Sequence, residues 1–499
     1  MWEPRDYNIV MILVDNLRKE LFEKNLHMFK NIQTYIIDRS VSDISTILTP
    51  VSETASSLQS ISTGMAPCDP GPVYFYRQTG KVLNLYNSQN PQRGFLNRRS
   101  TFFHNMPGQT AAIHLPHHGD VDNPHFGTVK IRHYLRNPVS ILLNGILDNH
   151  NNAVVERYKE HLEDIDPSID PAYFPVYDRL GHIKPDEELL EIYRKNLDKD
   201  IGRICKTIDE TPWPDGGSRL EKTAIILMSD HSNSTTDENI DLNRFLIKET
   251  GLAKCSPLAQ AYPETAALVY GNCIAKLYTE GTLEPGIAKD INAIAESGFV
   301  EHIILRIEQG VRVYSHSEDY GDATSDIEYH KGEYDKGEYH KGSYRIRVLD
   351  GQPFGYNDRL LKELSDNCNT AGKILELVEE HDKGTDQPLG IMGSVHLLEH
   401  RDAGEICLIS NPNKAFGRTR NPRQGWPFRR SYNFNHGTFH REHCEAVFYI
   451  AGPPELKSAG IRRTAWMPDI RPTLESIMGI MPENSYDGQP LVAARQQLL

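Results

Sequence analysis

The sequence has no apolar stretch long enough to cross a membrane as a helix. Its longest apolar runs, such as 9–14 and 224–228, are far shorter than the roughly 18–20 residues that a membrane helix needs. The amino terminus is polar and leads directly into a strand-like run, without the basic and then apolar segments of a secretory signal. We therefore expect a soluble protein that does not bind membranes.

Cysteine is scarce and shows no pairing pattern. The seven cysteines are scattered along the chain, odd in number and free of CxxC spacing. In a chain of this length such cysteines are typical of free or buried thiols in a reducing compartment. We therefore expect a cytoplasmic location.

Net positive charge is absent as well. The 54 Lys and Arg residues are outnumbered by 68 Asp and Glu residues, giving a formal net charge of −14. This balance argues against a protein built to bind nucleic acid or an anionic membrane. The content of 38% hydrophobic and 24% charged residues is enough for a sizeable core and too little charge for general disorder. At about 150 residues per domain, 499 residues suggest about three domains, but one large α/β domain with insertions fits equally well.

Two continuous apolar runs end close to an acidic residue. Residues 8–14 stop at Asp15, and residues 224–228 are followed by Asp230. Such runs suit strands that are covered on both faces, as in a parallel sheet. Residues 405–410 and 446–451 also have strand character, and 186–209 carries an apolar stripe at helical spacing. This alternation predicts an α/β fold, a mostly parallel sheet sandwiched by helices, whose ligands bind beyond the carboxyl ends of the strands.

Two regions have the composition of insertions into one domain that spans 1–499. Residues 66–175 are rich in Pro, Gly, Asn and His and have weak periodicity, so we expect an insertion or cap beside the pocket. Residues 310–350 contain a five-residue Tyr/Lys/Gly repeat, seen clearly over 328–344. Its alternating charge predicts a solvent-exposed extension, which serves either as an assembly edge or as a plain surface ribbon.

Several short motifs contain residues suited to metal or phosphate chemistry. Asp15 ends a buried strand, where an acid is costly unless it is paired or bound to a cation. The segment 49–64 has Ser52, Thr54 and Ser56 at the start of a helix, and each is either an ordinary cap or a phosphate-facing hydroxyl.

Three further motifs combine acids with histidines. Asp178 and His182 are spaced DxxGH, which places a carboxylate and an imidazole on one cation. Asp230 and His231 directly follow a buried strand. His436 lies in an Asn-His-Gly sequence some 15 residues before Gly452-Pro453. Each motif alone is common by chance.

The set of motifs and their order are specific. A strand-terminal Asp15, a helix-starting Thr54 ten residues before Gly64, DxxGH, a helix, a strand into Ser-Asp-His and a late His-Gly follow one another. In this order the chain resembles the alkaline phosphatase superfamily, within it the type I phosphodiesterase/nucleotide pyrophosphatase branch. The tail 469–491, with Asp-Ile-Arg-Pro-Thr and Tyr-Asp-Gly-Gln-Pro-Leu, is similar to the carboxyl-terminal signature of that superfamily.

The resemblance implies a hydrolase of phosphodiesters or pyrophosphates with two divalent metal ions, Zn²⁺ or else Mn²⁺. It implies Thr54 as the nucleophile, through a phospho-threonine intermediate, and a small phosphate ester as the substrate. The implied ligands fall into two groups: Asp15, Thr54, Asp230 and His231 for one ion, and Asp178, His182 and His436 for the other. His440, four residues beyond His436, is an alternative ligand.

The chain also departs from its relatives. Many of them have Asp-Gly where this chain has Asp15-Asn16, which changes the turn without changing the ligand. The sulfatase signature CxPxR is absent, because Cys68 lies in Pro-Cys-Asp-Pro without the arginine. Two other functions stay open: a phosphomonoesterase or phosphoryl transferase of the same superfamily, and a scaffold that retains the fold without catalysis. The sequence does not separate a nucleotide from other phosphate esters, and it leaves the oligomeric state open.

Overall fold

The computed structural model describes residues 7–494 apart from short and longer gaps. The gaps are 68–72, 77–80, 85–99, 105, 114, 116–119, 126–143, 250–265, 280–290, 318–320, 331–332, 336–337, 341, 368–369, 382–384, 401–402, 417–432, 459–463 and 483–484.

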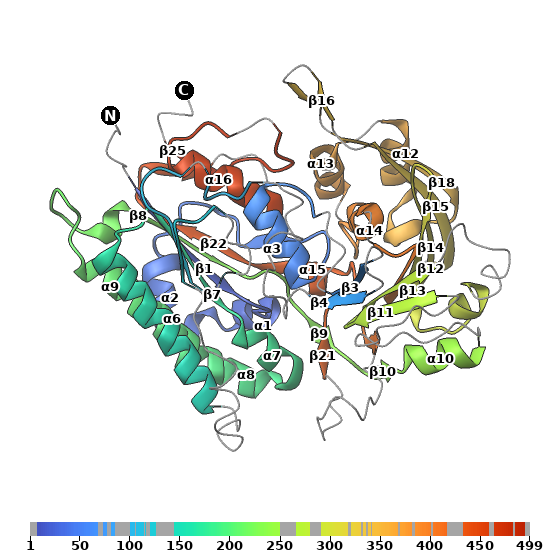
Figure 1. Ribbon diagram of the computed structural model, residues 1–499, viewed down its shortest axis with the longest axis horizontal. Helices are drawn as coiled ribbons and strands as arrows, with labels where there is room; N and C mark the ends of the chain where they lie inside the picture. Colours follow the sequence, from blue (N-terminus) through green and yellow to red (C-terminus); the bar gives the residue numbers. More distant parts are fainter. Residues whose placement is uncertain are drawn as a thin grey trace.

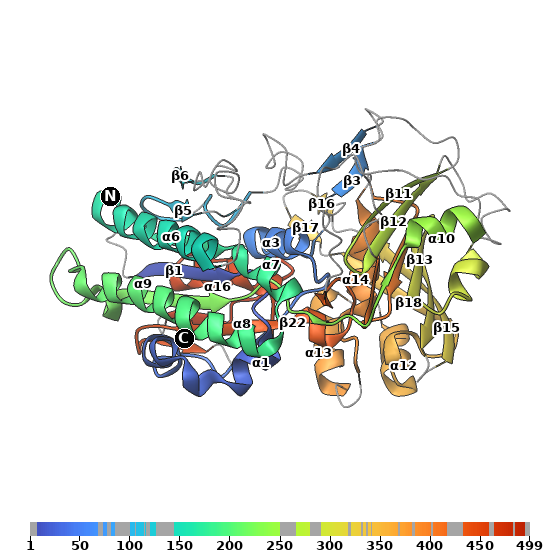
Figure 2. The same ribbon diagram turned by 90° about the horizontal axis from the view of Figure 1, so that it is seen from below.

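Two sheets lie side by side, each with its own covering helices (Figures 1 and 2). The central sheet has eight strands in the order β24-β2-β22-β8-β1-β7-β5-β6. Strands β8, β1, β7, β5 and β6 are parallel, whereas β22 runs antiparallel to both β8 and β2. The expected α/β class with a largely parallel sheet is thus confirmed. The strand bounds are β1 Asn8–Val14, β2 Thr46–Leu48, β5 Ala111–Ile113, β6 Asn123–His125, β7 Ile169–Phe174, β8 Thr223–Met228, β22 Glu445–Ala451 and β24 Ala465–Trp466.

The central strand β1 supplies side chains to two separate cores. Val10 and Ile12 pack in the core that holds helices α1 (Lys19–Lys24), α6 (Asn144–Asp164) and α9 (Asp198–Glu210). Ile9 and Met11 pack on the opposite face against α3 (Thr54–Thr63) and α16 (Ile470–Ile477). Each fully buried side chain of this size contributes about 1.5–3 kcal/mol of transfer free energy. This two-faced burial explains why β1 is apolar at every position from Ile9 to Val14.

The predicted helix over 186–209 is present as one continuous rod. It consists of α8 (Asp186–Ile192), a π-helical turn over Tyr193–Leu197 and α9. Its apolar stripe faces the central sheet, with Tyr193, Ile201 and Cys205 fully buried.

The second sheet is antiparallel, and the sequence did not predict it. Its order is β11-β12-β19-β13-β14-β15-β18. Its strands are β11 Ala266–Gly271, β12 Ile274–Thr279, β13 Val300–Ile307, β14 Gly310–Ser317, β15 Gly321–His330, β18 Ser343–Asp350 and β19 Ile406–Ser410. Helix α10 (Leu242–Glu249) covers one face, and α12 (Asp358–Asp366), α13 (Ala371–His381) and α14 (Gly390–Glu399) cover the other. The strand expected at 405–410 therefore exists as β19, between two antiparallel neighbours.

The two regions with the composition of insertions differ in their structural roles. Residues 66–175 contain β5, β6, β7 and α6, which are part of the central sheet and its helical layer rather than a separate cap. The repeat forms a small hairpin of β16 (Glu333–Asp335) and β17 (Glu338–His340) between β15 and β18. The hairpin projects from the second lobe in Figure 1.

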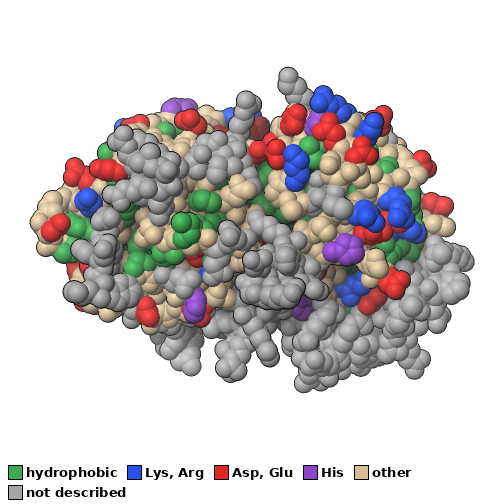
Figure 3. Space-filling view, turned by 90° about the horizontal axis from the view of Figure 1, so that it is seen from above, with side chains coloured by type: hydrophobic (Ala, Val, Ile, Leu, Met, Phe, Trp, Pro, Cys, Tyr) green, Lys and Arg blue, Asp and Glu red, His purple; other side chains and the backbone are tan. Residues whose placement is uncertain are grey.

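Among the described residues, no helix is both long and apolar enough to span a bilayer. On the face seen in Figure 3, acidic and basic side chains are interspersed over the lobe of the second sheet.

Candidate functional site

Three neighbouring strands of the central sheet direct carboxylates to one edge. Strand β1 lies between β8 and β7, and all three are parallel. Asp15 directly follows β1, and Asp230 lies two residues after β8. Asp178 lies on α7 (Val176–Ile183), the helix that follows β7. Because the carboxyl ends of parallel strands meet at one edge, residues far apart in the sequence converge there.

Helix α3 begins at this edge with Thr54. The residue before it, Glu53, has extended backbone geometry and makes no side-chain cap to the helix. The Thr54 hydroxyl donates to Asp15 Oδ1 at 3.5 Å and lies 3.1 Å from His231 Nε2. The Thr54 hydroxyl therefore lies beside the acids, whereas that of Ser52, another of the three candidates, donates to the Thr438 carbonyl at 2.8 Å.

Asp15, Asp230 and His231 form what we call the first ligand set. His231 Nε2 lies 3.6 Å from Asp15 Oδ1 and 3.5 Å from Asp230 Oδ2, and one ligand atom from each residue lies within 4.8 Å of the others. All three side chains are buried. Tyr173 donates a short hydrogen bond to Asp15, but Asp230 Oδ2 has no hydrogen-bond partner among the described residues.

Asp178, His182 and His436 form the second ligand set. Asp178 Oδ1 lies 3.2 Å from His182 Nε2 and 3.8 Å from His436 Nε2. His182 Nδ1 donates to the Phe434 carbonyl at 2.7 Å, and His436 Nδ1 donates to the Ser52 carbonyl at 2.6 Å. Since carbonyls only accept, each Nε2 can carry the lone pair that a metal needs.

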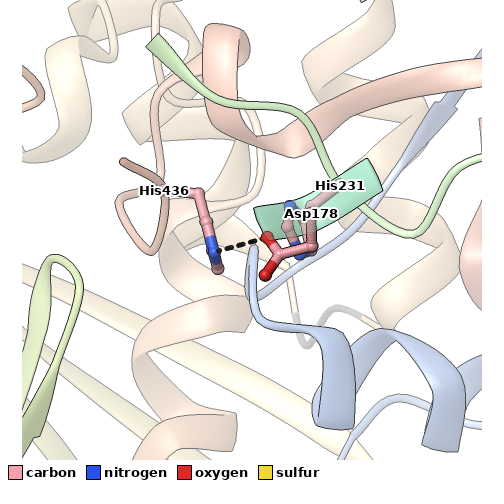
Figure 4. A group of neighbouring side chains, drawn as sticks. All are labelled: Asp178, His231 and His436. Carbon is pink, nitrogen blue, oxygen red and sulfur yellow. Dashed lines mark ion pairs between the residues drawn. The ribbon is translucent and has the colours of Figure 1, made fainter. Parts of the chain in front are cut away.

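The two sets lie next to each other. The rings of His231 and His436 stack with centroids 3.9 Å apart, and Asp178 groups with both histidines within 4.8 Å. Figure 4 shows His436 on its loop, with its ring nitrogen directed at the Asp178 carboxylate and His231 close by.

The electrostatics of the two sets differ. Burial, together with the nearby Asp230 and Asp178 carboxylates, raises the pKa of Asp15 well above its ordinary value. The pKa of Asp178 is lowered, because His182, His436 and His231 outweigh the effect of burial. Burial and the neighbouring histidines hold the pKa of His436 well below its ordinary value. Several buried carboxylates held this close repel one another unless a cation lies between them.

These residues fit divalent metal ions. The donors are three carboxylates and three imidazoles, two of which can carry a lone pair on Nε2 because Nδ1 donates to a carbonyl, and one buried carboxylate oxygen lacks a donor among the described residues. Mixed oxygen and nitrogen donors of this kind suit zinc, and manganese less well.

Asn16 holds the first turn and touches both sets. Its φ of +54° lies in the left-handed region, where glycine and asparagine are favoured, so Asn16 adopts a turn that a glycine would also adopt. It also adds an amide, which donates to Asp178 Oδ1 at 3.1 Å, while its backbone N–H donates to Asp230 Oδ1 at 3.1 Å. The sequence alone gave no sign of this bridge.

The two glycines of the histidine motifs allow close packing. A Cβ on Gly181 would come within 2.9 Å of the Asn16 amide nitrogen. Gly437 has a φ of +110°, and a Cβ there would lie 3.2 Å from a carboxylate oxygen of Glu53. The small residue in each motif therefore lets a ligand-bearing segment approach its neighbour.

Arg18 connects the ligand-bearing segments and was not singled out from the sequence. Its guanidinium is buried, donates to Gly181 O and Asn233 Oδ1 at 2.9 and 2.8 Å, and lies 3.8 Å from the ring centroid of Phe434. It also forms a short ion pair with Asp186. The only signal in the sequence was its position, three residues after Asp15.

His440, the alternative to His436, points elsewhere. Its Nε2 lies 2.8 Å from Glu301 Oε2, and Gln387 donates to the same carboxylate at 3.0 Å. Glu301 raises the pKa of His440 despite the opposing effect of burial. His440 thus belongs to a polar network of the second lobe, in contact with β13.

The fold is similar to that of known proteins. Two solved structures of murine ectonucleotide pyrophosphatase/phosphodiesterase 5 match over 96% of this chain and 97% of theirs. Their TM-scores are 0.53 and 0.52 at 13% and 12% identity, and the second is an inactive variant in complex with AMP. At this identity the match establishes the fold. A search of curated protein sequences finds no match.

The family of the chain follows from a match of its sequence to a family model. The family described as type I phosphodiesterase / nucleotide pyrophosphatase matches residues 9–437, most of the chain. The chain belongs to this family, which confirms the resemblance and the enzyme class of hydrolases that act on phosphoric ester bonds.

Proposed function

We propose that this chain hydrolyses phosphodiester or pyrophosphate bonds of small substrates at a two-metal site, with Thr54 as the nucleophile. The observation that carries the proposal is the position of Thr54. Its hydroxyl lies at the start of α3, 3.1 Å from His231 Nε2, beside a convergent set of buried carboxylates and imidazoles.

The two ligand sets would each hold one ion. Asp15, Asp230 and His231, with the Thr54 hydroxyl, would bind the first, and Asp178, His182 and His436 the second. Bound divalent ions would neutralise the phosphoryl oxygens and lower the pKa of a bound hydroxyl or water. We favour His436 over His440 as the ligand because His440 forms an ion pair with Glu301.

The protein's own groups would carry out the reaction in two steps. The deprotonated Thr54 oxygen attacks phosphorus, the bond to the leaving oxygen breaks, and phospho-threonine forms; a water molecule then cleaves this ester and restores Thr54. The first backbone N–H groups of α3 have no acceptor within the helix by its geometry, and they would donate to a phosphoryl oxygen. Asn16 holds the Asp178 and Asp230 carboxylates in position during both steps through its two hydrogen bonds.

The substrate class includes nucleotides. Support comes from the family and from the similar murine protein, whose inactive variant was solved with AMP. A nucleotide monophosphate released from a dinucleotide or a nucleoside polyphosphate is therefore the product we expect.

The deciding test compares bis-p-nitrophenyl phosphate with p-nitrophenyl phosphate, on protein stripped of metal and reloaded with zinc or manganese. We expect metal-dependent turnover that is faster on the diester. Faster cleavage of the monoester would favour the phosphatase alternative with the same ligands. Absence of metal-dependent turnover on either compound, and on a panel of dinucleotides, would contradict the proposal.

A further inference from the structure

The second sheet reaches the phosphoryl site through one hairpin. Asn272 lies at the turn between β11 and β12, with a φ of +51°. The turn is fixed from two sides: the Cys273 N–H donates to the His436 carbonyl at 3.1 Å, and the Phe416 N–H donates to the Asn272 carbonyl at 2.8 Å. The backbone hydrogen bond from Cys273 therefore fixes the tip of this hairpin against the loop that carries His436.

The Asn272 amide is directed at the second ligand set. Because His436 Nδ1 donates to a carbonyl, its Nε2 accepts, and the Asn272 amide nitrogen lies 3.0 Å from it. The side chain of Asn272 also hydrogen-bonds to Glu53, the residue before Thr54. An amide nitrogen has two hydrogens, so Asn272 can satisfy both partners at once. It thereby lies between a ligand candidate and the residue that precedes the nucleophile.

The His436 lone pair cannot accept this hydrogen and bind a cation at the same time. When His436 serves as a ligand, one N–H of Asn272 loses its acceptor beside the reacting group. A polar hydrogen left without a partner in a half-buried place is unfavourable, and a substrate bound in the loaded site would bring a new acceptor, an oxygen of its phosphoryl group.

We propose that Asn272 is a substrate-binding residue: when a cation takes the His436 lone pair, the amide turns away from His436 and donates to a non-bridging oxygen of the phosphoryl group, while its contact with Glu53 keeps it beside the site. This inference rests on the proposed function, because it assigns His436 to a cation. It gives the second sheet a direct part in recognition. A neutral donor is suited to the single charge of a phosphodiester.

The test uses zinc-loaded full-length protein and inorganic phosphate as the probe. Asn272→Gly removes the amide and keeps a residue that tolerates positive φ, whereas Asn272→Ala removes the amide at the cost of backbone strain. Asn367→Ala is the matched control, since its amide donates to the Glu363 carbonyl on the surface of α12. Bound zinc, phosphate affinity by calorimetry, and KM and kcat for bis-p-nitrophenyl phosphate are measured for each.

We expect Asn272→Gly to bind as much zinc as wild type and to lose about tenfold in phosphate affinity, with a similar rise in KM. Asn272→Asp, which presents a carboxylate to the phosphoryl group, should lose more. The control should match wild type in all four quantities.

Wild-type phosphate affinity in Asn272→Gly would overturn the proposal, even if Asn272→Ala were impaired, because the defect would then come from backbone strain. Loss of bound zinc in Asn272→Gly would also overturn it, since the amide would then act on His436 and not on substrate. Failure of the proposed function is separate, because it would appear as absent zinc-dependent hydrolysis in wild type. The comparison of phosphate affinities would still test Asn272.

Discussion

The two ligand sets lie next to each other but balance their charges in opposite ways. The first set, Asp15, Asp230 and His231, is at most 6% exposed and contains two carboxylates for one imidazole. In the second set Asp178 is 30% exposed and is shared by His182 and His436. The first set therefore has an excess of carboxylates, which a bound cation or a proton on Asp15 relieves, whereas the second is partly neutralised by its own histidines. Metal binding should accordingly matter most to the first set.

The largest effect is expected at the hydroxyl beside the first set. Thr54→Ala should lower kcat at least about a thousandfold, because no other side chain supplies the attacking oxygen. Bound metal should stay close to the wild-type amount, since the carboxylates and imidazoles remain. Turnover and metal content measured on the same preparation check this. Thr54→Ser is the matched control and should keep measurable activity; wild-type rates in Thr54→Ala would exclude Thr54 as the nucleophile.

Removing one carboxylate from the first set should cost both metal and activity. Asp230→Asn should release about one equivalent of metal and lower kcat/KM by more than about a hundredfold, because the remaining ligands no longer balance a divalent charge. Metal analysis and initial rates provide the measurement. The exposed Asp38→Asn change is the control and should leave both quantities unchanged. Full metal content in Asp230→Asn would show that Asp230 is not a ligand.

In the metal-free protein the two sets should respond with opposite signs. Asp15→Asn should raise the free energy of unfolding by about 1 kcal/mol near neutral pH, because it removes a carboxyl whose ionisation is opposed by burial and by the Asp230 and Asp178 carboxylates. Asp178→Asn should lower it, because His182 loses its partner. Chemical denaturation after complete removal of metal measures both. A change of the same sign in the two variants would contradict the difference described above.

The smallest effect concerns pH and the second set. Asp178 raises the pKa of His182 even though burial acts to lower it. A raised histidine pKa contributes stability that is complete below the unfolded value, about 6.5, and is lost as pH rises through the folded value. The metal-free protein should therefore become less stable above about pH 6.5. His182→Gln should remove this slope, and so should saturating zinc, which takes the place of the proton. An unchanged slope in His182→Gln would assign it to another group.

Site residues that lie in short sequence motifs could be predicted from the sequence. Asp15 and Asp230 could be placed at one edge because each follows a strand whose apolar run is visible in the sequence, whereas Asp178 was found from the DxxGH motif alone. The partners in space were not visible: Asn16 contacts Asp178 across 162 positions, and Asn272 contacts His436 across 164. Such contacts depend on the packing of a hairpin against a loop, which no local pattern encodes.

The second sheet was missed for a different reason. In β14 the buried residues alternate, with Val311 and Val313 inside and Arg312 between them, and this period of two is a strand signal. The composition of the nearby Tyr/Lys/Gly repeat favoured a solvent-exposed extension for the whole region 310–350, so the alternation in β14 was not used to predict a strand. The region 66–175 was likewise judged by its Pro and Gly content, although β7 within it is buried at every position.

The order of the ligands along the chain bears on how the protein is made. Strand β1 pairs with strands about 160 and 215 positions later, and His436 lies 421 positions after Asp15. Contacts of such high sequence separation form slowly, and a nascent chain synthesised only as far as Ser410 contains Thr54 and all three candidate carboxylates but lacks His436. Such an incomplete chain has the proposed nucleophile without the full set of candidate ligands. The proposed hydrolysis would therefore begin only after His436 has been synthesised and has reached the site.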